Sequence, residues 1–135
     1  SDINFFYRGT NLDSNLIFIS ATFKGLTEDS KKIEKKIDDF INRKKNTQPF
    51  KIKTCGSTFK NPQGKKAWKL IKESGCAGMK VGDAEISEKH CNFFINNGKA
   101  KSKDLEKLIE NVQRKVLAKT GIKLELEIKI IGEKK

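Results

Sequence analysis

The 135-residue sequence has few of the residues that form disulfides or bind zinc in small domains: three cysteines and one histidine. Cys55, Cys76 and Cys91 are an odd number at no framework spacing, which favours reduced thiols in a cytoplasmic protein over disulfides. One histidine and scattered cysteines argue against a zinc site, so we expect no metal. No apolar run approaches the about 18 residues of a membrane span, and we expect no signal peptide at Ser1.

Common nucleotide-binding and redox motifs are also missing. The sequence has no GxGxxG following a strand, no GxxxxGK[ST] and no CxxC. These motifs therefore give no argument for a mononucleotide-binding or metal-dependent enzyme.

Positive charge, by contrast, is abundant. The chain carries 29 Lys and Arg against 17 Asp and Glu, a formal net charge of +12, but only three of the cations are arginines. Arginine is the usual bidentate reader of guanine and phosphate, and many of the lysines alternate with acids, as in residues 31–39. We therefore expect no dedicated nucleic-acid binding, whereas a basic pocket for a small anionic substrate fits the composition.

Apolar spacing predicts three helices. The first has Thr27 as a plausible N-cap and runs to about Arg43, and a short second helix ends at Gly75. The third begins near Ser102, has an apolar stripe and ends at Gly121. The predicted core positions of these helices are Ile33, Ile37, Phe40, Ile41, Ala67, Leu70, Ile71, Leu105, Leu108, Ile109, Val112 and Val116.

Strands are predicted between and beyond these helices. Residues 15–24 read as a strand buried on both faces, and residues 84–86 and 93–96 as short strands. Residues 50–53 favour a short extended stretch, and residues 124–130 alternate apolar and charged side chains, as a terminal strand does. The expected fold class is α+β, with helices packed on a small mixed or antiparallel sheet.

The segment 55–64 is rich in turn-forming residues and holds a cluster of reactive groups. Ser57 offers a hydroxyl, Lys60 a cation and Asn61 an amide within five positions. Such a cluster suits a phosphate or carboxylate and a proton transfer, but it equally suits a capped turn before a helix.

Glu127 and Arg8 are similarly open to two interpretations. On an alternating strand, Glu127 is either a solvent-facing ion-pair partner or an acid that lines a cleft. Arg8 follows Tyr7, and without further context it is a surface cation.

Taken together, the blocks of the sequence resemble the UDP-N-acetylenolpyruvoylglucosamine reductase (MurB) family of peptidoglycan synthesis, in its compact form. The resemblance runs in order over nearly the whole chain. It rests on Tyr7-Arg8, Gln48-Pro49, the signature Gly56-Ser57-Thr58-Phe59-Lys60-Asn61-Pro62, residues 67–71, Gly75, Gly78, residues 81–84, residues 87–93, Asn96, Gly98, Gly121, residues 124–128 and Ile131-Gly132.

The resemblance implies a flavin-dependent reduction in which NADPH reduces FAD and hydride then passes to the enolpyruvyl ether of UDP-N-acetylglucosamine, giving UDP-N-acetylmuramate. It implies that Arg8 and Glu127 polarise the substrate carboxylate, with Glu127 protonated to donate, and that Ser57 is the general acid. It further implies substrate contacts by Tyr7, Gln48, Lys60, Asn61 and His90, and a location in the bacterial cytoplasm.

The long region that would hold FAD in this family has no counterpart in the sequence. We therefore expect residues 1–26 to be the tail of a flavin-binding domain and residues 27–135 to be the substrate-binding domain. The expected partners are the enolpyruvyl nucleotide and the missing flavin-binding domain, and the chain should be inactive alone. The alternative is a stand-alone module that binds a UDP-sugar or another polyanion, such as nucleic acid.

Overall fold

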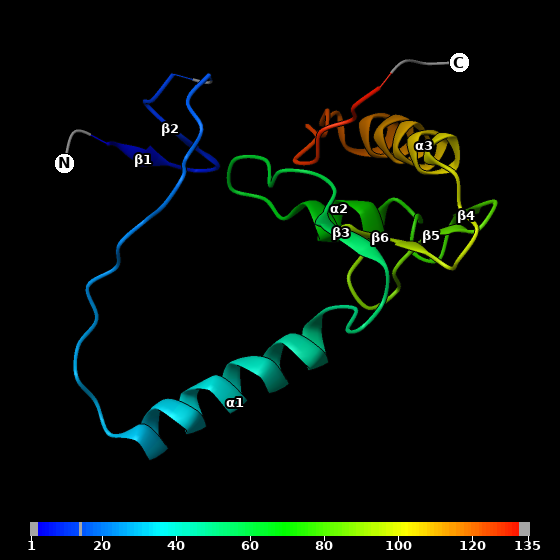
Figure 1. The fold of residues 1–135 in the computed structure, drawn as a ribbon. Helices are drawn as coiled ribbons and strands as arrows, with labels where there is room; N and C mark the ends of the chain where they lie inside the picture. The colour runs from blue at the N-terminus through cyan, green and yellow to red at the C-terminus, as the bar shows by residue number, and fades with distance from the viewer. Residues whose placement is uncertain (1–2, 14, 133–135) are drawn as a thin grey trace.

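The fold of the computed structural model is α+β, with helices against a small antiparallel sheet, which confirms the predicted class (Figure 1). The structure describes residues 3–13 and 15–132. Strands β3, β6, β5 and β4 form the main sheet in that order, and β1 and β2 form a separate hairpin. The elements are β1 (Phe5–Phe6), β2 (Gly9–Thr10), α1 (Ser30–Thr47), β3 (Thr54–Ser57), α2 (Ala67–Glu73), β4 (Lys80–Val81), β5 (Ala84–Ile86), β6 (Phe93–Asn96) and α3 (Ser102–Thr120).

The core lies between α2, α3 and the sheet. Four of the five predicted core residues of α3 are buried and the fifth, Leu105, is partly buried against the core; α2 buries the three residues that its spacing indicated. Gly121 ends α3 in the left-handed conformation, at φ 70°, and its N–H donates to the carbonyl of Leu117. The buried apolar cluster is Phe59, Ala67, Leu70, Ile71, Cys76, Ala84, Ile86, Cys91, Phe94, Leu108, Ile109, Val112, Val116 and Leu124.

Strands β5 and β6 match the prediction, whereas their two neighbours do not. Residues 55–57 belong to β3, although they lie in the segment that we expected to form turns, and β4 lies in a segment for which we predicted no strand. Both segments extend because β6 and β5 offer them antiparallel partners. Residues 50–53, predicted to be extended, form no strand.

The prediction of a buried strand at residues 15–24 is wrong. Residues 15–24 form no strand and are exposed; Ile19, for example, is 95% exposed. A strand buried on both faces needs neighbouring strands and covering layers, and the described chain provides neither for this segment. In Figure 1 this apolar segment runs from β2 to α1 and packs against neither the sheet nor α3.

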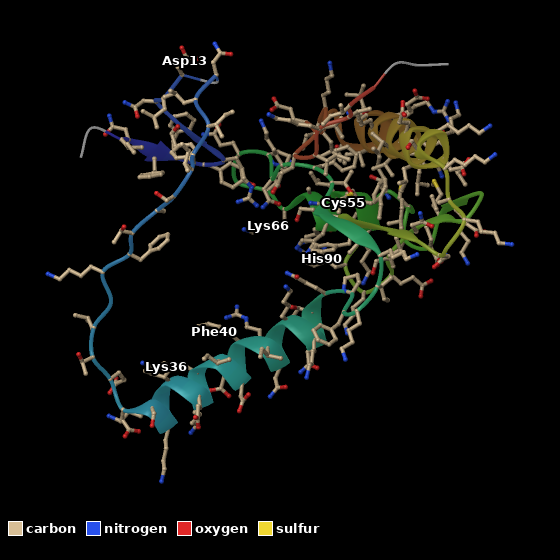
Figure 2. All side chains as sticks on the ribbon, in the orientation of Figure 1. Asp13, Lys36, Phe40, Cys55, Lys66 and His90 are labelled. Atoms are coloured by element: carbon tan, nitrogen blue, oxygen red, sulfur yellow. The ribbon has the colours of Figure 1, made fainter. Side chains whose placement is uncertain are left out.

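Helix α1 forms as predicted but starts later, ends later and packs differently. Asp29, not Thr27, caps it by accepting from the Lys32 N–H at 3.1 Å, and the helix continues to Thr47. None of its residues is buried, and the apolar stripe of Ile33, Ile37 and Phe40 faces solvent. Figures 1 and 2 show α1, with Phe40 on it, standing apart from the sheet and α3.

The terminal strand is shorter than its alternating pattern indicated. Only Leu126 forms a bridge, with Phe59, and Ile130 is 52% exposed. Leu124 is fully buried, and Leu126 and Ile128 pack partly buried against the core, so the predicted apolar face is correct near the bridge. In this register Ile128 and Ile130 would lie opposite Ser57 and Cys55 of β3, but no bridge forms there in the described part of the chain.

Candidate functional site

The loop that follows β3 is fixed by one buried residue, Asn92. The Asn92 carbonyl accepts from the Thr58 N–H at 2.8 Å, and its Oδ1 accepts from the Phe59 N–H at 2.9 Å. Its Nδ2 donates back to the Phe59 carbonyl at 2.8 Å. Asn92 is only 3% exposed, so this amide replaces a strand partner for the loop. Residue spacing did not predict this role for Asn92; the available signal was a polar residue next to an apolar strand.

The C-terminal segment runs antiparallel beside this loop. The Lys60 N–H donates to the Glu125 carbonyl at 2.8 Å, and the Glu127 N–H donates to the Thr58 carbonyl at 2.9 Å. The pairing places Glu127 opposite Thr58, one residue from Ser57. The sequence-predicted hydroxyl loop and acidic strand thus lie side by side, although 70 positions separate Ser57 from Glu127.

The turn between β1 and β2 brings Arg8 to the same place. Arg8 Nε donates to Glu127 Oε1 at 2.7 Å, and this hydrogen bond together with the carboxylate charge raises the pKa of Arg8. The two side chains are 47% and 24% exposed, so the pair is open to solvent and to a ligand. Of the three residues predicted to be catalytic, two are in direct contact and the third is in the adjoining strand.

Tyr7 lies between Arg8 and the loop. Its hydroxyl oxygen accepts from the Asn61 N–H at 3.0 Å, and the Arg8 guanidinium carbon lies 5.0 Å from the centre of its ring. The Asn61 side chain is also occupied, because Oδ1 accepts from the Ala67 N–H at 2.9 Å at the start of α2. Both residues therefore have a structural role beside the substrate contacts that we predicted, which stay predictions.

A cavity of about 380 Å³ adjoins this group of residues. Lys60 lies on its wall, where the ammonium is 3.6 Å from the Glu125 carboxylate, and Lys123 adds a second cation. Cations of this kind suit an anionic ligand. The lining residues are Tyr7, Lys60, Asn61, Pro62, Gln63, Lys123 and Glu125.

His90 and Gln48 are not joined to the Arg8–Glu127 pair by any hydrogen bond in residues 3–13 and 15–132. His90 packs edge-on against Phe93, with ring centres 4.7 Å apart, and its buried Nδ1 has no partner. Burial lowers the pKa of His90, which favours the neutral ring. Gln48 ends α1, where its N–H donates to the Lys44 carbonyl. Their predicted substrate contacts stay untested.

Neither a membrane span nor a metal cluster is found in the part of the chain that the structure describes. No helix there combines the length and the apolar character that crossing a membrane requires. Over the same residues, no three His, Cys, Asp or Glu side chains gather closely enough to hold a metal ion.

Comparison with known proteins gives one consistent family. Residues 48–131 match the sequence model of the C-terminal domain of UDP-N-acetylenolpyruvoylglucosamine reductase. The reductase of Gluconobacter oxydans is 46% identical over 133 residues, and that of Rickettsia conorii is 49% identical over 131. These alignments cover 98% and 97% of this chain but 44% of each relative, so the chain spans less than half of their length.

A solved structure agrees with these relatives. The crystal structure of the reductase (MurB) from Thermus caldophilus has a TM-score of 0.62 and 38% identity, covering 73% of this chain and 34% of that one. The chain therefore belongs to the UDP-N-acetylenolpyruvoylglucosamine reductase family, and its residues 48–131 correspond to the family's C-terminal domain.

Proposed function

We propose that this chain is the C-terminal part of a reductase that converts UDP-N-acetylglucosamine enolpyruvate to UDP-N-acetylmuramate, a step of peptidoglycan synthesis in the bacterial cytoplasm. The observation that carries the proposal is the contact between Arg8 and Glu127 beside the Ser57 loop, in a chain of this family. The cation and the carboxyl group are in contact there, and Ser57 belongs to the neighbouring strand β3, which supports the proposal.

The reaction that we propose creates negative charge next to a carboxylate, and the observed pair addresses that charge. FAD, reduced by NADPH, supplies the hydride. The Arg8 guanidinium would lie where the enolate charge develops and lower the barrier electrostatically. In the observed geometry Glu127 accepts from Arg8 Nε, so it orients the guanidinium; to donate to the substrate carboxylate, Glu127 would have to bind a proton first.

Ser57 is the proposed general acid, giving a proton to the carbon next to the carboxylate. A serine hydroxyl is a weak acid, so its effect depends on placement against a basic enolate. Gly56, the preceding residue, has a φ of +84° and open space where a Cβ would lie. This open position leaves room for another group beside Ser57, and we propose that FAD lies there and is held mainly by a part of the protein outside this chain.

We further propose that the substrate nucleotide lies along the basic cavity, contacted by Lys60 and Asn61, with Tyr7, Gln48 and His90 as the remaining predicted contacts. The cations on the cavity wall support this placement. Lys60 is already paired with Glu125, so an incoming phosphate would compete with that carboxylate.

The exposed apolar surface of residues 16–41 supports the proposal of a further domain. The side chains on this surface with at least 40% exposure are Leu16, Ile17, Phe18, Ile19, Phe23, Leu26, Ile33, Ile37, Phe40 and Ile41. Apolar surface of this extent marks a site that another part of a protein covers. The relatives have more than half their length outside the aligned region, and we propose that the corresponding part of this protein, the flavin-binding domain, packs here.

The domain boundary after residue 26 stays a prediction. Two observations favour placing α1 with the flavin-binding domain instead, which would move the boundary to about Gln48. The helix buries none of its residues in this chain, and the family's C-terminal domain begins to match at residue 48.

Replacing Ser57 by alanine in the full-length protein tests the function. Flavin reduction by NADPH should keep its rate, because that half-reaction does not need the proton from Ser57. Reoxidation of the flavin by the enolpyruvyl nucleotide should fall by at least about 100-fold, the usual contribution of general acid catalysis. Stopped-flow absorbance resolves the two steps.

The exposed Ser102 at the start of α3 provides the matched control, and Ser102→Ala should leave both half-reactions unchanged. Retention of the second half-reaction in Ser57→Ala would remove Ser57 from the mechanism. A wild-type protein that does not reoxidise with the enolpyruvyl nucleotide would contradict the proposed function as a whole.

A further inference from the structure

We infer that Tyr7 is a positioning residue for Arg8: its hydroxyl anchors the β1–β2 turn to the catalytic loop, and its ring orients the guanidinium. This inference rests on the proposed function for the role of Arg8. It gives Tyr7 this role in place of the substrate contact that the family resemblance predicted, and the experiments below separate the two roles.

The hairpin that carries Arg8 does not hold its own place. Its strands are two residues each, and an isolated two-stranded hairpin is at best marginally stable in water. Phe5 and Phe6 are 77% and 63% exposed, so apolar packing does not dock the hairpin either. The position of Arg8 must therefore come from contacts of the turn itself.

Two hydrogen bonds join the turn to the body of the domain. The Tyr7 hydroxyl accepts from the Asn61 N–H at 3.0 Å, and Arg8 Nε donates to Glu127 at 2.7 Å. The two partners are fixed relative to each other, because backbone hydrogen bonds pair residues 58 and 60 with residues 127 and 125. The adjacent turn residues Tyr7 and Arg8 thus bind two neighbouring segments, which contain Asn61 and Glu127 and are themselves joined by backbone hydrogen bonds.

The anchor at Asn61 is independent of that residue's side chain. Its donor is the backbone N–H, while the side-chain Oδ1 accepts from the Ala67 N–H. The Tyr7 hydroxyl therefore binds a group whose place is set by the loop and by the start of α2. Without this anchor, the turn would pivot about the solvent-exposed Arg8–Glu127 pair.

The backbone of Arg8 itself needs an external restraint. Its φ of 61° lies in the left-handed region, which is unfavourable for a residue with a Cβ. Such conformations persist where neighbouring contacts hold them, and they are frequent at functional sites. The Tyr7 ring, whose centre is 5.0 Å from the guanidinium carbon, restrains the cation through a cation–π contact.

The hydroxyl and the ring can be tested separately. Tyr7→Phe removes the anchor and keeps the ring, whereas Tyr7→Leu removes both. In the full-length protein we expect reoxidation of the flavin by the enolpyruvyl nucleotide to slow about 10-fold in Tyr7→Phe and about 100-fold in Tyr7→Leu, as expected for a misplaced catalytic group. Flavin reduction by NADPH and the KM for the nucleotide should change less than about threefold.

A double-mutant cycle separates positioning from substrate contact. If Tyr7 acts through Arg8, Tyr7→Phe has no further effect once Arg8 is alanine. A direct contact with the nucleotide would instead raise KM, and its loss would add to that of Arg8. An additive cycle or a change confined to KM overturns the inference.

A readout without turnover keeps the inference independent of the proposed function. This chain has three arginines, so the Arg8 Nε–H can be resolved by NMR. Its exchange with water should be slow in the wild type, because Nε donates to Glu127, and at least about fivefold faster in Tyr7→Phe, since a weakened hydrogen bond protects less. Equal protection in the two proteins would overturn the inference even if the reductase activity is confirmed.

Discussion

Replacing Asn92 by alanine should lower the free energy of unfolding of this chain by about 3 kcal/mol. The Asn92 side chain satisfies both backbone groups of Phe59, which is fully buried. The substitution removes two hydrogen bonds, each with a net value of about 1 kcal/mol. It also leaves a buried N–H and a buried carbonyl without partners, and together these two groups add a penalty of about 2 kcal/mol. Ordered water entering the small space left behind would return part of that loss.

Urea denaturation followed by circular dichroism measures this change, and an unchanged m-value would show that the two states keep their compactness. Asn92→Asp should be at least as destabilising, because its carboxylate would be a buried charge without a cation and would face the Phe59 carbonyl, to which it cannot donate. The matched control is Asn97→Ala, whose exposed amide donates to Glu85 at 2.8 Å and whose loss should cost less than about 0.5 kcal/mol. A loss below about 1 kcal/mol in Asn92→Ala would refute the view that this amide holds the loop.

Two further predictions concern groups outside the loop. Burial lowers the pKa of His90, so below about pH 6.5 the unfolded chain binds the proton more readily than the folded chain does. The free energy of unfolding should therefore fall as the pH drops from 6.5 through the lower folded pKa. His90→Gln should flatten this dependence in urea titrations at pH 7.5 and 5. If the slope survives in His90→Gln, another group causes it. Ile37 is 51% exposed on α1, so Ile37→Ala should change the free energy of unfolding of this chain by less than about 0.5 kcal/mol. In the full-length protein the same substitution should cost about 2 kcal/mol if the flavin-binding domain covers the helix. Equal small effects in both proteins would contradict that packing.

The parts of the fold that the sequence predicted well are those whose partners lie within residues 48–132. The stripe of α3 and the Gly121 stop were correct because the helix covers a sheet of the same chain. Strands β5 and β6 were found for the same reason, since they are central in the sheet order. In these elements the spacing of apolar residues indicates a surface that other parts of the same chain bury.

The errors lie where burial depends on something outside the described chain or on pairing that periodicity does not encode. Residues 15–24 and the stripe of α1 are apolar but exposed, so their pattern describes a surface with no partner in this structure. Residues 124–130 alternate, yet within the described chain they form a single bridge, between Leu126 and Phe59. Alternating apolar and charged residues indicate which face of a strand is apolar, but a sheet forms only where a neighbouring strand is available for pairing.

The candidate site was predictable mainly through the family resemblance. Residue spacing alone left Arg8 as a surface cation and Glu127 as either an ion-pair partner or an acid in a cleft, since no local rule joins a turn near residue 8 to a strand near residue 127. The 2.7 Å contact between them is a tertiary result. The hydrogen bonds between the Asn92 side chain and the Phe59 backbone were not predicted either, because an asparagine before a strand is common in simple turns.

The union of Arg8 and Glu127 has a consequence for biosynthesis. During translation Arg8 is made 119 residues before its partner, an interval of roughly ten seconds at ordinary rates of elongation. Throughout that time the guanidinium lacks the Glu127 carboxylate, and an exposed ion pair is too weak to offset the entropy of closing so long a loop by itself. The pair therefore forms only after the core has drawn the two segments together, which makes it a signature of a completely assembled domain.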